Sequence, residues 1–144
     1  MELPCGEDLN FWDSGKSTPD SWIDKAIALI ESLGGSVLSH AFGAEHGGRA
    51  AYMLRFEIGI EEYRLVWPVL PTRSTKPSAA ITARRQAATM LYHDCKAKCL
   101  KAVIFGARTA FFEYLVLPDG RTVSQVSNHE LSDMAPKFLL NGGE

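Results

Sequence analysis

The sequence predicts an α+β fold. We expect an N-terminal helix, a three-stranded antiparallel sheet, a long amphipathic helix packed on that sheet, and a C-terminal apolar element with a turn and a short helix. Three observations predict it. Ser78–Phe105 contains no Gly or Pro and repeats its apolar residues at helical spacing. Ala50–Ile58 and Glu61–Leu70 alternate apolar and polar residues as half-buried strands do. A capped apolar stripe at residues 18–33 precedes them.

Length and composition fit a single globular domain. The chain has 144 residues, and the 46% that are hydrophobic and 22% that are charged are ordinary proportions for a folded protein. We expect a flexible lead-in at residues 1–17, one α+β domain at 18–138 and a tail at 139–144. No apolar run approaches the roughly 20 residues that span a bilayer, and the N-terminus lacks a basic region followed by an apolar one. The sequence therefore predicts a soluble, cytoplasmic protein with no membrane contact.

The first helix has clear start and stop signals. Thr18 is suited to cap it, Pro19 suits its first position, and Gly34 with the glycine that follows ends it. Phe11 and Trp12, in the lead-in, are candidate anchors on the body of the domain. The apolar stripe of this helix consists of Ile23, Ala26, Ile27, Ile30 and Leu33.

Three strands follow this helix. The first covers Ser36–Phe42, the second Ala50–Ile58, and a tight Gly59-Ile60 turn leads into the third, Glu61–Leu70. Pro68 has no amide hydrogen to donate, so the third strand lies at an edge of the sheet or ends there.

A two-residue turn places Arg55 directly opposite Arg64 on the outer face of the hairpin. Like charges that face each other across strands are unfavourable. Diagonal ion pairs with Glu57 and Glu62 would relieve the repulsion, and we favour this arrangement. An anion held between the two arginines is the alternative.

The long helix is preceded by a polar loop at residues 71–78 that carries two bases between prolines. Cys95 and Cys99 lie four residues apart on the helix, and no further ligand motif accompanies them, so we expect small core residues and no metal site. The apolar arc consists of Ile81, Ala88, Leu91, Cys95, Ala102 and Val103.

The C-terminal part begins with a strongly apolar element, helix or strand, that must be largely buried. Pro118-Asp119-Gly120 is a turn signal, and Thr122–Val126 is short enough to return as a strand. Ser127 and Glu130 form a capping-box pattern for a final helix that Pro136 stops. The apolar element consists of Phe111, Phe112, Tyr114, Leu115 and Leu117.

Charge is unevenly distributed along the chain. Residues 72–109 carry eight bases against one acid, whereas residues 1–34 carry seven acids against two bases. The basic block suggests a local anionic partner. A solvated helix face, neutralised by acids from other segments once the chain folds, is the equal alternative.

The search for catalytic motifs is negative: the sequence has no GxGxxG, P-loop, HExxH or GxSxG. His40, His46 and His93 are the residues that a small enzyme would use as a base or metal ligand, and this is a third hypothesis. We expect no catalytic residue, no metal and no cofactor.

Several segments resemble a small-protein family encoded by phages and other mobile elements. They are Tyr63–Pro68 (YRLVWP), His93–Val103 (HDCKAKCLKAV) and Leu117–Val123 (LPDGRTV). In that family the helix often reads KAKLEAV, and a glycine and an aromatic-rich turn lead to LPDGRTV. This chain departs from the pattern at Cys99 and Lys101. The resemblance spans about residues 22–126, and it implies a mobile-element context without supplying catalytic residues.

These observations favour a non-enzymatic, nucleic-acid-binding accessory protein of a phage or mobile element. Interleaved aromatics and bases favour single-strand binding or annealing, and the order of elements has a weaker similarity to the core of single-strand annealing recombinases. The alternative is a protein-binding inhibitor or adaptor that acts on a host or defence-system factor, and homo-oligomerisation stays open. The nucleic-acid hypothesis requires its bases to gather on one side of the molecule. The candidate phosphate-contacting residues are Arg55, Arg64, Arg73, Lys76, Arg84, Arg85, Lys96 and Lys98.

Overall fold

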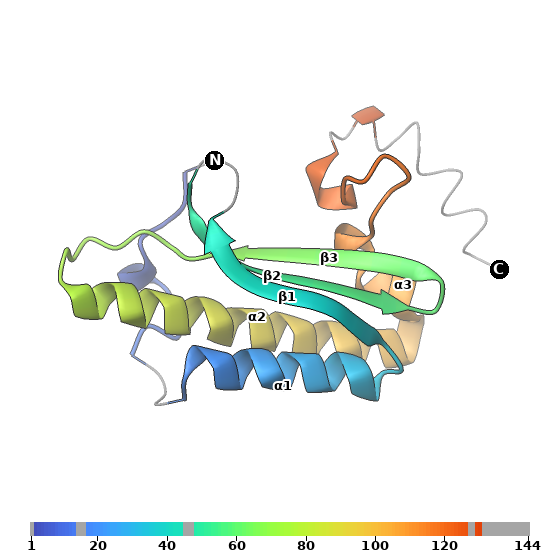
Figure 1. Cartoon of the computed structure of the whole chain (residues 1–144), viewed down its shortest axis with the longest axis horizontal. Helices are drawn as coiled ribbons and strands as arrows, with labels where there is room; N and C mark the ends of the chain where they lie inside the picture. Colours follow the sequence, from blue (N-terminus) through green and yellow to red (C-terminus); the bar gives the residue numbers. More distant parts are fainter. Residues whose placement is uncertain (1, 14–16, 45–47, 127–128, 131–144) are drawn as a thin grey trace.

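The predicted α+β architecture is confirmed. The computed structural model describes residues 2–13, 17–44, 48–126 and 129–130. A three-stranded antiparallel sheet in the order β1-β2-β3 is covered on one face by α1 and α2, which run side by side (Figure 1). The helices and strands are α1 (Pro19–Ser32), β1 (Ser36–Ala44), β2 (Ala50–Ile58), β3 (Glu61–Pro68), α2 (Pro77–Phe105) and α3 (Ala107–Ala110). Three short 3-10 helices, η1 (Gly6–Asp8), η2 (Phe112–Tyr114) and η3 (Val123–Gln125), complete the fold.

Helix α1 begins and ends where the local signals predict. The backbone N–H of Ser21 donates a hydrogen bond of 3.2 Å to the Thr18 hydroxyl, and Pro19 occupies the first turn. After Ser32 the chain leaves the helix through Gly34, whose φ of +93° is a left-handed conformation that glycine adopts without a Cβ clash. The stop signal therefore acts through backbone geometry alone.

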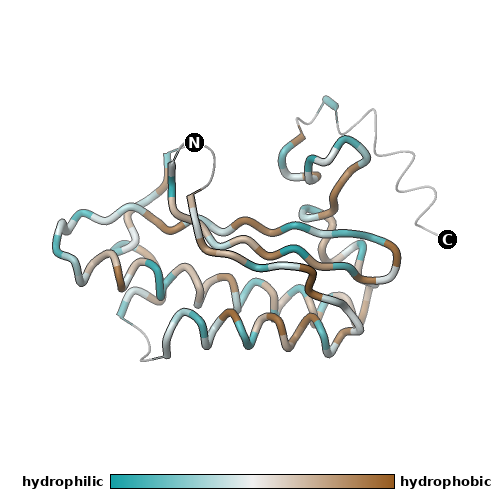
Figure 2. The backbone as a smooth tube through the Cα atoms, in the orientation of Figure 1, coloured by the Kyte–Doolittle hydropathy of each residue, from teal (hydrophilic) through white to brown (hydrophobic). Residues whose placement is uncertain are grey.

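The sheet keeps the predicted register. Gly59 and Ile60 form the turn between β2 and β3, and Arg55 lies opposite Arg64. Hydropathy alternates along the strands (Figure 2). β1 extends two residues further than predicted, to Ala44, and β3 ends at Pro68, two residues early. β3 is an edge of the sheet, as the proline requires.

Helix α2 matches its predicted range, but two of its apolar residues are not buried. Ala88, Leu91, Cys95 and Ala102 are buried as expected, whereas Ile81 and Val103 are 60% and 75% exposed. α1 has 14 residues and α2 has 29. Because a helix rises about 1.5 Å per residue, α1 covers only about half of the length of α2. Ile81 lies near the start of α2, beyond the part of that helix that α1 covers, whereas Val103 lines an open groove beside Leu29 and Leu33 of α1. The predicted burial of both residues was wrong.

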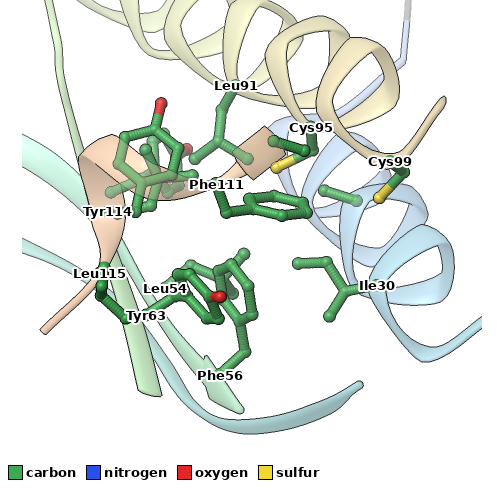
Figure 3. Close-up of a cluster of buried hydrophobic side chains, with 14 of the residues drawn as sticks. Ile30, Leu54, Phe56, Tyr63, Leu91, Cys95, Cys99, Phe111, Tyr114 and Leu115 are labelled. Atoms are coloured by element: carbon green, nitrogen blue, oxygen red, sulfur yellow. The ribbon is translucent and has the colours of Figure 1, made fainter. Parts of the chain in front are cut away.

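The main core lies between the helices and the strands (Figure 3). Phe111, which follows α3, is fully buried and packs edge-to-face on Phe56 of β2 at 5.3 Å between ring centroids. Its ring also lies 5.8 Å from that of Tyr63 on β3. Cys95 and Cys99 approach the same cluster from α2, so their assignment to the core is confirmed.

The N-terminal segment differs from its prediction as a flexible lead-in, because residues 6–12 pack against the domain. The Gln86 side-chain amide of α2 donates to the backbone carbonyls of Gly6 and Asn10 at 2.8 and 3.0 Å. The N–H of Gly6 donates to the carbonyl of Pro71 at 2.8 Å. Phe11 is an anchor, as predicted, and stacks on His93 at 4.8 Å. A polar side chain inside the domain therefore holds a segment that has no hydrophobic periodicity.

The C-terminal apolar element is buried as predicted, but it folds as short 3-10 turns and isolated bridges. Val116 pairs with Thr122 across the predicted turn, where the N–H of Gly120 donates to the carbonyl of Leu117 at 2.8 Å. Residues 123–125 form η3 in place of the expected strand. The Ser127 cap, the end of the final helix at Pro136 and the tail at 139–144 lie outside the described residues.

Candidate functional site

The eight predicted phosphate-contacting bases are spread over separate parts of the surface. Arg55 and Arg64 lie on the face of the sheet that is turned away from the helices. Arg64 donates to the carbonyl of Gly120 and to Oε1 of Gln125, both at 2.9 Å. No ion pair from either arginine to Glu57 or Glu62 is found among the described residues, so the favoured diagonal pairing was wrong. Arg64 is instead held by the C-terminal segment.

A second group of bases lies around the start of α2. Arg73 forms an ion pair of 2.7 Å with Asp8, and Lys76 is exposed at the N-cap of the helix. Arg84 donates through Nε to the hydroxyl of Tyr52 at 2.7 Å, and its guanidinium lies 3.9 Å from the ring centroid of Phe42. Arg84 thereby joins α2 to the β1–β2 hairpin, which is a structural role.

The remaining three bases lie further along α2. Arg85 is half-buried, and Lys96 is exposed. The ammonium of Lys98 lies 3.0 Å from Asp94 and 2.8 Å from Glu113. Burial lowers the pKa of Lys98, but the two carboxylates outweigh it and raise that pKa above its ordinary value. Lys98 is therefore a charged residue neutralised within the fold.

These positions contradict the expectation that the eight bases gather on one side. Arg64, Arg73, Arg84 and Lys98 are among those held by partners within the chain, and the eight are divided between the sheet and the helix layer. Successive residues on a helix point about 100° apart, so bases that are close in the sequence of α2 diverge in space.

The candidate catalytic residues do not converge either. His40 lies on β1, and His93 lies on α2 against Phe11; His46 is outside the described residues. Burial raises the pKa of the Cys95 thiol to about 12 and also raises that of Cys99, so both stay protonated at neutral pH. In the described ranges, no group of three or more His, Cys, Asp or Glu residues is placed to hold a metal ion.

The groove between the C-terminal halves of α1 and α2 is the surface feature that sequence reasoning missed. It has a volume of about 540 Å³ and is open to solvent. Only Ser32, His93 and Lys96 contribute polar side chains to it, so it offers no converging set of catalytic groups. Its lining consists of Leu29, Ser32, Leu33, His93, Lys96, Ala97, Cys99, Leu100 and Val103.

No family model, curated protein or solved structure matches the chain. The resemblance to the phage family therefore stays a prediction. Within the described part of the chain, none of the helices is both long enough and apolar enough to cross a membrane.

Exposed apolar side chains continue from the groove along the end of α2. Leu100 and Val103, which line the groove, and Ile104 beside them are each two-thirds or more exposed. A signal for this surface is present in the sequence of residues 99–105 (CLKAVIF), where apolar residues occur on more than one side of the helix. A helix packed against one layer buries a single face, so part of this run had to remain exposed.

Two basic side chains lie at the groove. Lys96 is exposed at its wall, and the ammonium of Lys25 on α1 lies 4.6 Å from the ring centroid of Trp22. Trp22 in turn packs on Tyr92 of α2, so Lys25 lies on the α2-facing side of α1. At 100° per residue, the exposed acids Asp20, Asp24 and Glu31 fall on the opposite side of α1.

Proposed function

We propose that the protein is a protein-binding adaptor that docks one helix of its partner in the groove between α1 and α2. The observation that carries the proposal is the exposed apolar surface of Leu100, Val103 and Ile104 beside that groove. Large contiguous patches of exposed apolar surface are uncommon on monomeric proteins and are typical of interaction sites. Two helices packed side by side leave a groove between them that fits the apolar face of a third helix.

The basic rim indicates the charge of this partner helix. Lys96 and Lys25 lie near the groove, whereas the exposed acids of α1 lie on the side of that helix turned away from the groove. A helix whose apolar face is flanked by carboxylates would complement this rim. A host or defence-system factor as the source of the helix stays a prediction, as does a cytoplasmic location.

Leu100→Glu tests this function. We expect the free energy of unfolding of this variant to stay within about 0.5 kcal/mol of the wild-type value, because the side chain is exposed. Partner binding should weaken at least about tenfold, because the new carboxylate would be buried without a partner against apolar surface. The measurement is nuclease-treated capture from a host lysate, followed by the Kd of each purified captured protein.

Ile60→Glu is the matched control. Ile60 is 98% exposed in the β2–β3 turn, in the sheet layer and outside the groove lining. A captured protein supports the proposal only if it binds wild type and Ile60→Glu alike and loses affinity for Leu100→Glu. Equal binding to all three proteins would contradict a role for the groove.

Nucleic-acid binding is a second candidate, carried by the exposed bases Arg55, Lys76 and Lys96. No carboxylate bonds these three side chains in the described part of the chain. Because Arg55 is on the sheet and Lys96 on the helix layer, we expect one strand to contact few of them. The affinity for single- and double-stranded oligonucleotides should therefore fall only moderately with salt. In a plot of the logarithm of the binding constant against the logarithm of the salt concentration, we expect a slope no steeper than about −2. Arg55→Glu should reduce the slope by about 1, and absence of binding at low salt would remove this candidate.

A further inference from the structure

β1 is an open edge of the sheet. It pairs with β2 on one side only, and in Figure 1 it is the strand drawn nearest to α1. Eight of its nine residues are exposed, whereas alternate residues of the central strand β2 are buried. An edge strand turns about half of its backbone N–H and C=O groups away from its neighbour, where a further strand can bond to them.

The sequence of β1 has no charged residue and no proline that would block such pairing. Ser36–Ala44 (SVLSHAFGA) contains no Lys, Arg, Asp, Glu or Pro. Natural edge strands are commonly blocked by charged residues, prolines or bulges. The register of β1 on β2 shifts once, between Val37 and Ser39. From Ser39 to Ala44 the two strands pair regularly.

An acidic stripe accompanies this edge. Asp20, Asp24 and Glu31 are exposed and fall within about 40° of one another around the axis of α1. They lie on the side of α1 opposite Leu29 and Leu33, which line the groove with α2. α1 packs on β1 and has α2 on its other flank (Figure 1), so we infer that the side of α1 turned away from α2 faces the open edge of the sheet. Among the described residues, no base forms an ion pair with any of the three carboxylates.

We propose that the β1 edge docks an extended, basic segment of a partner protein, which adds a fourth strand to the sheet. This surface is independent of the groove and of the adaptor function proposed for it. Backbone hydrogen bonds to β1 supply the affinity, and Lys or Arg at alternate positions of the incoming strand point toward the acidic stripe. Two strand residues span about 6.7 Å, close to the rise of about 6 Å between Asp20 and Asp24 along α1.

The same charges argue against two other occupants. If β1 paired with β1 of a second copy, the two α1 helices would approach each other with three carboxylates on each side. Like charges in such a position oppose association. A nucleic-acid backbone would be repelled in the same way. A basic peptide strand is the occupant for which backbone and charge agree.

The probe is a synthetic peptide of about eight residues, with lysine at alternate positions and valine between them. Two matched peptides accompany it, one with glutamate for lysine and one with N-methyl groups on the amides of the pairing edge. We expect the basic peptide to bind, to weaken as salt rises, and to slow amide hydrogen exchange in Ser39–Ala44. The other two peptides should not bind measurably. Fluorescence anisotropy and NMR exchange are the measurements.

Protein variants locate the site. Asp24→Lys should weaken binding of the basic peptide about tenfold, because two unit charges change at an exposed position. Glu62→Lys makes the same charge change on β3, at the far edge of the sheet, and should leave binding unchanged. Leu100→Glu should bind like wild type, which separates this site from the groove.

Four outcomes overturn the proposal. They are no binding of the basic peptide, equal binding of the acidic or the N-methylated peptide, an equal effect of Asp24→Lys and Glu62→Lys, and a dimer in which β1 amides are already protected in the free protein. The first three remove the basic strand as occupant, and the fourth replaces it with a second copy.

Discussion

Replacing Phe111 with alanine is expected to lower the free energy of unfolding by about 3–5 kcal/mol. Phe111 is fully buried, and its ring contacts Phe56 of β2 and Tyr63 of β3 while Cys95 of α2 lies above it (Figure 3). Removing the ring loses its burial and leaves a cavity between two layers that cannot both move inward. Urea unfolding followed by circular dichroism measures the change.

Ile60→Ala is the control for this prediction. The side chain is 98% exposed, so its truncation should change the free energy of unfolding by less than about 0.5 kcal/mol. A loss below about 1 kcal/mol for Phe111→Ala would show that the segment after α3 does not belong to the main core.

Replacing Gln86 with alanine is expected to cost about 2–3 kcal/mol and to free the N-terminal segment from the domain. The buried amide donates to the carbonyls of Gly6 and Asn10, and both acceptors would lose their partner. Part of the cost is offset, because Oε1 of Gln86 is itself buried without a hydrogen-bond partner in the described structure. Amide exchange at Leu9, whose N–H donates to the carbonyl of Gly6 in η1, should accelerate more than exchange at Leu54 in the sheet.

Asn10→Ala is the control for this prediction, because it removes a side chain from the N-terminal segment without removing the backbone carbonyl that Gln86 bonds to. The Asn10 side chain is exposed, and its backbone carbonyl, which accepts from Gln86, is kept in the variant. We expect stability and exchange close to wild type. Equal destabilisation by Gln86→Ala and Asn10→Ala would mean that Gln86 does not hold this segment.

Local signals were sufficient wherever the backbone conformation depends on near neighbours. The Thr18 cap, the left-handed Gly34 and the two-residue turn at Gly59 each act over a few residues, so their positions were predictable. The register that places Arg55 opposite Arg64 follows from the turn length. The docking of residues 6–12 was not predictable, because it depends on Gln86, 80 positions from Gly6.

The candidate site was the least predictable part. A count of charges along residues 72–109 gives a basic block, but the fold brings Asp8 to Arg73, Glu113 to Lys98 and Glu61 to Arg108. Val103 was assigned to the buried arc by its angle on the helix, and that angle does not show that this side of α2 faces an open groove beside α1.

The sequence by itself determined the type, order and approximate limits of α1, the three strands and α2, because caps, turns and periodicity are short-range properties of the chain. The tertiary structure alone decided which charges are neutralised, which apolar residues stay exposed beside the α1–α2 groove, and that β1 has an open edge. These features depend on the relative lengths and positions of packed elements, and residues far apart in the sequence set them.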